Sequence, residues 1–95
     1  MITPFKVSVE QAVLDDLKVR IANTRWPDEI TGTSWTYGAS LAYMKELTAY
    51  WLNEFDWRKT ESEINRYENF KADIDGYDIH FMHIKSNRRK TIPII

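Results

Sequence analysis

The chain has 95 residues, which is enough for one domain with a small core. Its 13 basic and 14 acidic residues give a net charge of -1, so we expect no nucleic-acid partner held by charge. The absence of cysteine excludes disulfides and thiolate metal sites, and it favours an intracellular, cytoplasmic protein. No uncharged run reaches transmembrane length, so we expect a soluble chain with no membrane anchor.

The first helix is predicted from its cap and its apolar spacing. Ser8 is expected to be the N-cap, and apolar residues recur at helical spacing from there to about Asn23. Pro27 disfavours helix at the residue before it. A long aromatic linker follows, with Gly32 and Gly38 as breakers.

Two further helices are predicted after this linker. Ser40 is expected to cap the second, whose apolar positions between Leu41 and Phe55 follow a spacing of three and four. Asp56 is placed to cap a third, shorter helix. That helix carries Trp57, Glu61 and Ile64 on one face.

The sequence period changes to two beyond residue 69. Phe70–Ile74 and Tyr77–Ile84 are predicted strands, and Asp75-Gly76 between them is a strong hairpin signal. Large side chains alternate to both sides of the second strand, so we expect both faces to be partly covered. Thr91–Ile95 is predicted to begin a third strand, buried on both faces. The fold class is therefore α+β, with about three helices before an unfinished sheet.

Residues able to carry chemistry are few. His80 and His83 point to opposite faces of a regular strand, so they cannot share one metal ion, and we interpret both as structural. No nucleophile elbow or phosphate-binding loop is present, and we expect no catalytic residue, no metal and no cofactor. The basic cluster between Lys85 and Lys90 has no interleaved aromatic residue and is interpreted as a solvated loop.

Aromatic side chains are abundant for a chain of this length. Two interpretations are open: they line a ligand pocket, or they pack against a neighbouring domain, which we favour. The set comprises Trp26, Trp35, Tyr37, Trp51, Phe55 and Trp57.

Two short motifs stand out, Arg25-Trp26-Pro27-Asp28 and Phe55-Asp56-Trp57-Arg58. They resemble the N-terminal region of the microsomal-type epoxide hydrolases, and the resemblance covers nearly the whole chain. The other positions that we take as structural members of the family pattern are Trp35, Trp51, Gly76, His80 and His83.

The resemblance implies an α/β-hydrolase parent that opens an epoxide to a vicinal diol through an ester intermediate. Residues 1–69 would form a helical region that wraps the hydrolase core and its lid, and residues 70–95 would be the first strands of that core. None of the family's catalytic residues maps onto this sequence, and the apolar Thr91–Ile95 suggests a chain cut before the core. The partners expected are therefore that missing core and lid.

Three hypotheses for function follow. The first is the N-terminal region of a detoxifying epoxide hydrolase, inactive by itself and expected to self-associate through its exposed apolar surface. The second is a stand-alone protein-interaction module derived from that region, with the aromatic residues and the strand edge at Ile92–Ile95 as its partner surface. The third, an independent enzyme using His80 or His83, is disfavoured because no second reacting group stands at a suitable spacing.

Overall fold

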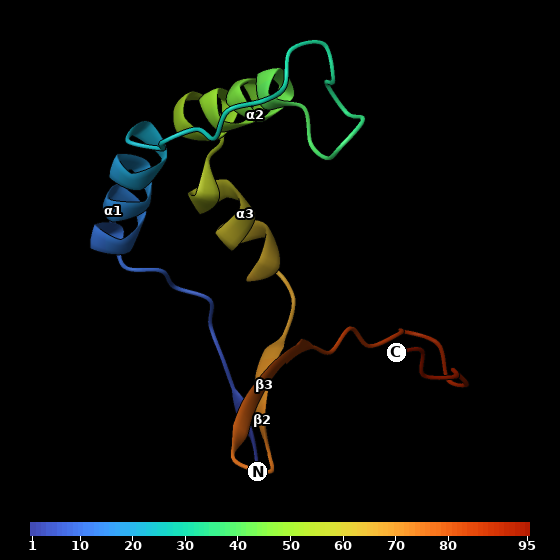
Figure 1. The fold of residues 1–95 in the computed structure, drawn as a ribbon. Helices are drawn as coiled ribbons and strands as arrows, with labels where there is room; N and C mark the ends of the chain where they lie inside the picture. Colours follow the sequence, from blue (N-terminus) through green and yellow to red (C-terminus); the bar gives the residue numbers. More distant parts are fainter. The chain divides into compact units, whose positions relative to one another are not determined.

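The structure, a computed structural model, describes all residues from 1 to 95. The chain forms two compact units, one made of Met1–Ser8 with Trp57–Ile95 and the other of Val9–Asp56. The three predicted helices and the antiparallel hairpin are confirmed (Figure 1). The elements in chain order are β1 (Ile2–Pro4), α1 (Gln11–Ala22), α2 (Leu41–Asn53), α3 (Trp57–Ile64), β2 (Asn69–Ile74) and β3 (Tyr77–Met82).

Helix α1 begins later than predicted. Its N-cap is Glu10, with an extended backbone at φ -58° and ψ 138°, and no side chain caps it, so the prediction of Ser8 as cap is wrong. The reason lies at Val7, whose N–H donates to Asn65 Oδ1 at 2.9 Å and whose carbonyl accepts from Asn65 Nδ2 at 2.7 Å. This clamp holds the chain before Ser8 extended, and the helix starts only beyond it.

The unit Val9–Asp56 is built on the packing of α1 against α2. Leu14, Leu17 and Ile21 are half-buried on one face of α1, as their spacing predicts. The opposite face carries the exposed pair Asp16–Arg20 at 2.7 Å, whose hydrogen bond and charge raise the pKa of Arg20. Because a raised arginine pKa keeps Arg20 charged throughout the ordinary pH range, the titration of Arg20 adds no pH dependence to stability there.

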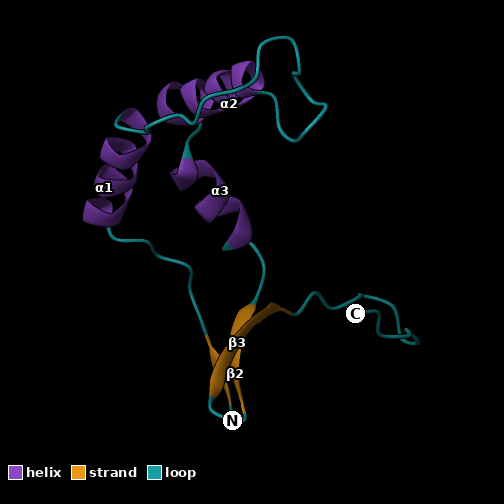
Figure 2. Cartoon of the chain, viewed as in Figure 1, coloured by secondary structure: helices purple, strands orange, loops and turns teal.

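The sheet belongs to the other unit and has the strand order β1-β2-β3, with both pairings antiparallel (Figure 2). The predicted turn is confirmed: Asp75 and Gly76 have φ values of 53° and 83°, which suit the tight turn of a two-residue hairpin. Ile74 pairs with Tyr77 directly across it.

The third strand lies elsewhere than predicted. Residues 91–95 form no strand, whereas β1 at the N-terminus pairs with β2 in the register Thr3 to Lys71. A strand needs a neighbour for its backbone hydrogen bonds, and the structure offers none to Thr91–Ile95. The prediction of a third strand at 91–95 is therefore wrong.

A buried asparagine joins α3 to the sheet. Asn69 is 5% exposed, and its Nδ2 donates to the carbonyl oxygens of Ile64 and Tyr67 at 3.0 and 2.8 Å. These carbonyls lie at the end of α3 and just beyond it, where no further helical N–H groups are available as donors. Asn69, the first residue of β2, thus supplies hydrogen-bond donors to carbonyl groups at the C-terminal end of α3.

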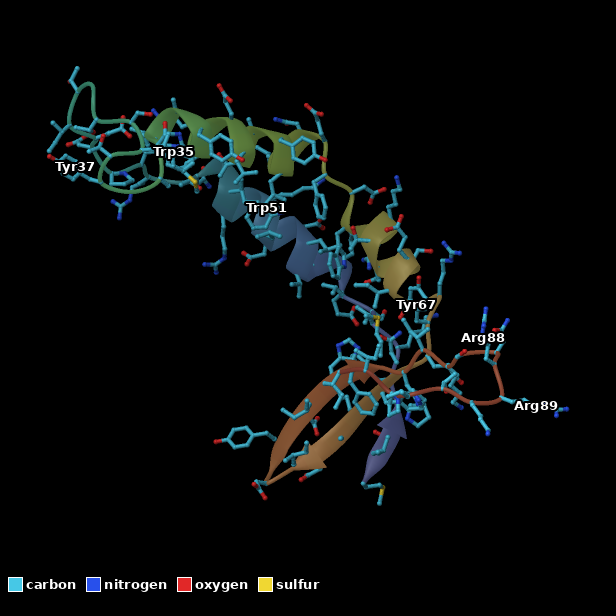
Figure 3. All side chains as sticks on the ribbon, turned by 90° about the vertical axis from the view of Figure 1, so that its right-hand side faces the viewer. Trp35, Tyr37, Trp51, Tyr67, Arg88 and Arg89 are labelled. Carbon is cyan, nitrogen blue, oxygen red and sulfur yellow. The ribbon has the colours of Figure 1, made fainter.

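The apolar surface of both units is largely uncovered. No apolar residue of the chain is buried. The predicted cover on both faces of β3 is absent from the structure, since Ile79 is 46% exposed on one face and Met82 is 49% exposed on the other. Four large side chains of α2 are exposed: Tyr43, Leu47, Tyr50 and Trp51. Trp51 is labelled in Figure 3.

Candidate functional site

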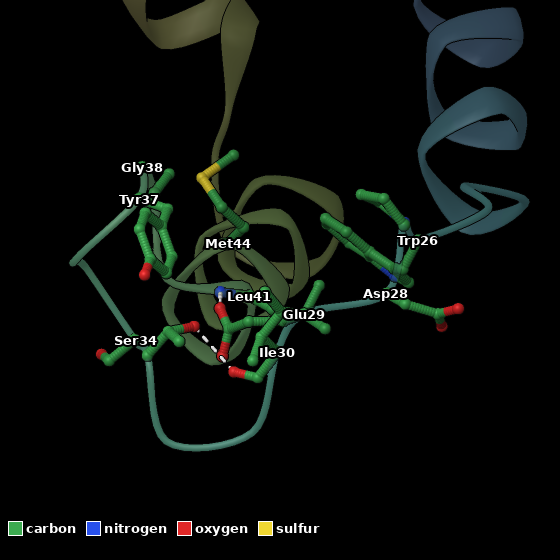
Figure 4. Close-up of a pocket in the computed structure, with 12 residues that line it drawn as sticks. Trp26, Asp28, Glu29, Ile30, Ser34, Tyr37, Gly38, Leu41 and Met44 are labelled. Carbon is green, nitrogen blue, oxygen red and sulfur yellow. Dashed lines mark hydrogen bonds between the residues drawn. The ribbon is translucent and has the colours of Figure 1, made fainter.

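A pocket of about 470 Å³ lies in the unit Val9–Asp56, between the linker and the start of α2. Three residues of the first family motif, Trp26, Pro27 and Asp28, line it together with Tyr37 and Met44. Figure 4 shows Trp26 and Asp28 on one side and Tyr37 on the other. Arg25, the fourth residue of the motif, is exposed and is not among the lining residues.

Two side chains close the N-terminus of α2 beside this pocket. Ser40 is the N-cap, as predicted: it is 6% exposed, and its Oγ accepts from the N–H of Tyr43 at 3.5 Å. Glu29 Oε2 accepts from the N–H of Leu41 at 2.7 Å. The positive end of the helix dipole also stabilises a carboxylate at this position. Glu29 therefore ties the linker to α2, a role that the sequence analysis missed.

Replacing Ser40 by alanine should lower the free energy of unfolding by about 1 kcal/mol, because the cap bond to Tyr43 is lost. Thermal unfolding followed by circular dichroism at 222 nm measures this change. Ser62→Ala on the exposed surface of α3 is the control and should not lower the midpoint, because alanine favours helix at an exposed position. Equal midpoints for Ser40→Ala and the native chain would show that Glu29 alone holds the helix end.

The predicted aromatic set is only partly brought together. Trp26 and Tyr37 line the pocket, whereas Trp35 packs on Tyr43 with ring centroids 5.2 Å apart and stays 58% exposed (Figure 3). Trp51 and Phe55 are exposed and lie outside the pocket lining.

The second family motif surrounds the start of α3. Asp56 immediately precedes the helix, and Trp57 and Arg58 are its first two residues. Trp57 Nε1 donates to Glu61 Oε2 at 3.1 Å, and Arg58 pairs with Glu61 Oε1 at 2.9 Å. This arrangement confirms that Trp57 and Glu61 share a helix face. Trp57 and Arg58 both bind the carboxylate of Glu61.

The two histidines lie on opposite faces of the sheet, as predicted. His83 lies 6.5 Å from Phe70, while His80 meets the edge of Phe5 at 5.2 Å. His80 Nε2 is 2.9 Å from Asn69 Oδ1. Because Nδ2 of Asn69 uses both its hydrogens on Ile64 and Tyr67, its Oδ1 faces the ring and the imidazole Nε2–H donates.

The surroundings of His80 are those of a structural side chain. Lys71 Nζ stands 4.5 Å from the centroid of the Phe5 ring and 3.6 Å from Asp78 Oδ2. No hydroxyl or thiol nucleophile is hydrogen-bonded to either imidazole. The structure brings no three metal-ligating side chains together, and no helix has both the length and the apolar character to cross a membrane.

Comparisons with known proteins agree with the motifs. The family model described as "Epoxide hydrolase N terminus" matches residues 2–95. A protein of Stigmatella aurantiaca named "Putative epoxide hydrolase" is 43% identical over 99% of this chain and 21% of its own length. Epoxide hydrolase 1 of Sus scrofa is 40% identical over 88% of this chain and 18% of its own length.

Solved structures give the same result. The crystal structure of juvenile hormone epoxide hydrolase from the silkworm Bombyx mori matches with a TM-score of 0.82 and 28% identity, over 95% of this chain and 22% of that one. The Aspergillus niger epoxide hydrolase matches with a TM-score of 0.78 and 30% identity, over 93% of this chain and 24% of that one. Both are α/β-hydrolases, and the chain spans about a fifth of the length of the curated relatives named above. The chain belongs to the epoxide hydrolase N-terminus family.

Proposed function

We propose that this chain acts as the N-terminal region of an epoxide hydrolase, where it covers the hydrolase core and its lid and contributes no reacting group. The family match and the relatives, in which the matched segment is about a fifth of the length, support this role. Within it, residues 1–69 would be the covering region and residues 70–95 the first strands of the core. We extend the proposal to a cytoplasmic, detoxifying enzyme.

The observation that carries the proposal is the uncovered apolar surface of α2. Leu47 and Trp51 stand one helical turn apart, and both are 43% exposed, with Tyr43 and Tyr50 nearby on the same helix. Removing apolar surface from water is worth roughly 25 cal/mol per Å², so such a face favours a protein partner. The hydrolase core of the relatives is the partner that the family supplies.

The reaction assigned to this family, epoxide plus water to a vicinal diol, would belong to the rest of the enzyme. The contribution of this region would be to exclude water from the active site and to hold the lid. The structural roles of the family-motif residues are part of the same proposal: Trp26, Pro27 and Asp28 shape the linker pocket, and Trp57 and Arg58 fix the start of α3.

A chimera tests this role directly. The chain replaces the matched segment of the Aspergillus niger epoxide hydrolase, and diol formation from styrene oxide is measured for the chimera, for the chain alone and for the truncated hydrolase. We expect diol from the chimera only. Diol formation by the chain alone would contradict the proposal.

Two double variants of the chimera distinguish the packing of α2 on the core from a nonspecific effect of substitution in α2. Leu47→Ser with Trp51→Ser removes apolar contact area and should abolish most of the diol formation. Lys45→Ser with Glu46→Ser lies on the same helix and should leave it unchanged, because both side chains are exposed and charged. Equal activity of the two double variants would show that α2 does not pack on the core.

A further inference from the structure

The linker pocket, which lies between the linker and the start of α2, is acidic. Of the twelve residues that line it, the charged ones are Asp28 and Glu29, and no lysine, arginine or histidine is among them. Neither carboxylate forms an ion pair, since the ion pairs of the chain lie elsewhere. Glu29 accepts a hydrogen bond from the Leu41 N–H at 2.7 Å. The pocket thus presents two carboxylates whose charge no basic side chain of this chain balances.

Aromatic surface accompanies these carboxylates. Trp26 and Tyr37 lie on opposite sides of the pocket (Figure 4), and Tyr37 is 80% exposed. A guanidinium group suits such a lining better than an ammonium group does. It is planar, it stacks on aromatic rings, and it binds a carboxylate through two parallel N–H groups. The lining therefore fits an arginine side chain.

The net charge of the surrounding unit also favours a basic partner. Residues 9–56 carry eight acidic and four basic side chains, which gives this unit a net charge of -4. The rest of the chain carries six acidic and nine basic side chains, a net charge of +3. A negative unit attracts and orients a basic surface during association. The acidic pocket is the part of this unit that can enclose a basic side chain.

The pocket is continuous with the exposed apolar face of α2. Met44 lines the pocket, and Leu47 and Trp51 follow it at spacings of three and four residues, so all three lie on one side of the helix. Leu47 and Trp51 are each 43% exposed, and the function proposed above places them against the hydrolase core. A surface that covers these two side chains therefore reaches the pocket at Met44.

We propose that an arginine side chain of the hydrolase core, its lid included, enters the linker pocket, where the guanidinium pairs with Asp28 and the stem packs on the Trp26 ring. The inference rests on the proposed function, and it adds the type of side chain that the core presents at this contact. Asp28 is the partner because one oxygen of Glu29 is already bound to the Leu41 N–H. Covering the pocket removes water from the pair and strengthens it.

Charge reversal in the chimera described above tests the pairing. Asp28→Lys places a like charge opposite the arginine, so the half-life of diol formation at a fixed elevated temperature should fall about tenfold. Asp28→Asn removes the charge without adding a like one and should shorten the half-life less. Glu46→Lys is the matched control, because it makes the same charge change on α2 outside the pocket lining, and it should leave the half-life unchanged. Equal half-lives for Asp28→Lys and Glu46→Lys would overturn the proposal.

The 95-residue chain by itself separates this effect from damage to the pocket. Asp28 forms no ion pair within the chain, so Asp28→Lys should not lower the midpoint of thermal unfolding of the chain, measured by circular dichroism. A fall in this midpoint that accounts for the loss in the chimera would show that the substitution acts within the chain. That result would also overturn the proposal.

Photochemical cross-linking identifies the occupant of the pocket. A benzophenone side chain in place of Tyr37 labels the group that enters the pocket, and mass spectrometry of the irradiated chimera locates the labelled peptide. We expect a peptide of the hydrolase core that contains an arginine. Replacing that arginine by glutamate should restore the half-life of the Asp28→Lys chimera. A label on a core peptide without arginine, or on a second copy of the chain, would contradict the proposal.

The failure of this inference and the failure of the proposed function give different results. A chimera that forms no diol even with the native Asp28 would contradict the proposed function, and the arginine contact with it. An active chimera whose half-life is insensitive to Asp28→Lys would contradict the arginine contact alone and leave the covering role of α2 intact.

Discussion

Replacing Asn69 by alanine should lower the free energy of unfolding of the sheet-containing unit by about 2–4 kcal/mol. The side chain is 5% exposed and makes three hydrogen bonds: to the carbonyls of Ile64 and Tyr67 and to the ring of His80. Alanine leaves all three partners without the hydrogen bonds that Asn69 supplies. Few apolar contacts are available in this chain to offset the loss.

Amide hydrogen exchange of Phe70, Lys71 and Ala72 measures this effect within β2. Protection should fall sharply in Asn69→Ala and also in Asn69→Asp, because a carboxylate cannot donate to the two carbonyls. Asn53→Ala is the matched control: Asn53 Nδ2 donates to the Ala49 carbonyl at 2.9 Å but is exposed. Unchanged protection in Asn69→Ala would show that the joint between α3 and β2 is held by other contacts.

Replacing Gly76 by valine should destabilise the hairpin by about 2–3 kcal/mol, because a β-branched residue is strained at a φ of 83°. Space is not the cause, since no atom lies within 4 Å of the place where a Cβ would stand. The loss should appear as weaker pairing of Ile74 with Tyr77, measured by the exchange rates of their amides.

Asparagine at the same position separates conformation from side-chain loss. Gly76→Asn adds a side chain of similar size but tolerates the left-handed region, so it should cost well under half as much as valine. Similar destabilisation by both residues would mean that the turn resists any side chain, and it would contradict the argument from φ.

Features governed by local chemistry were predictable from the sequence. The Asp75-Gly76 turn, the Ser40 cap and the end of α1 near Asn23 each depend on residues within a few positions of one another. Their backbone geometry follows from side-chain hydrogen bonding and from the conformational freedom of glycine. The structure confirms all three.

Features governed by distant contacts were not predictable. Strand β1 has three residues, one of them proline, and it exists because it meets Phe70–Ala72 in β2. Ser8 lost the cap position because Asn65 clamps Val7. The same limit applies to Thr91–Ile95, whose apolar pattern suits a strand but which pairs with no strand in the structure.

The candidate site was predictable in part. The Trp26-Pro27-Asp28 motif does line the pocket, but its closure depends on Glu29, which bonds to Leu41 twelve residues later. Asn65 and Asn69 were missed because asparagine near a helix end usually bonds within its own turn. Their spacing of four residues, between the end of α3 and the start of β2, was the available signal.

The sheet-containing unit is assembled from the two ends of the chain, with residues 9–56 inserted between them. Val7 is hydrogen-bonded to Asn65, 58 positions later, and β1 can pair only after β2 has been synthesised. During synthesis at about 5–20 residues per second, the N-terminal strand would remain unpaired for roughly 3–13 s. The helices α1 and α2 can form within that interval, because their contacts are internal to the inserted segment. The residues of β1 thus leave the ribosome well before the strand that supplies their final hydrogen bonds.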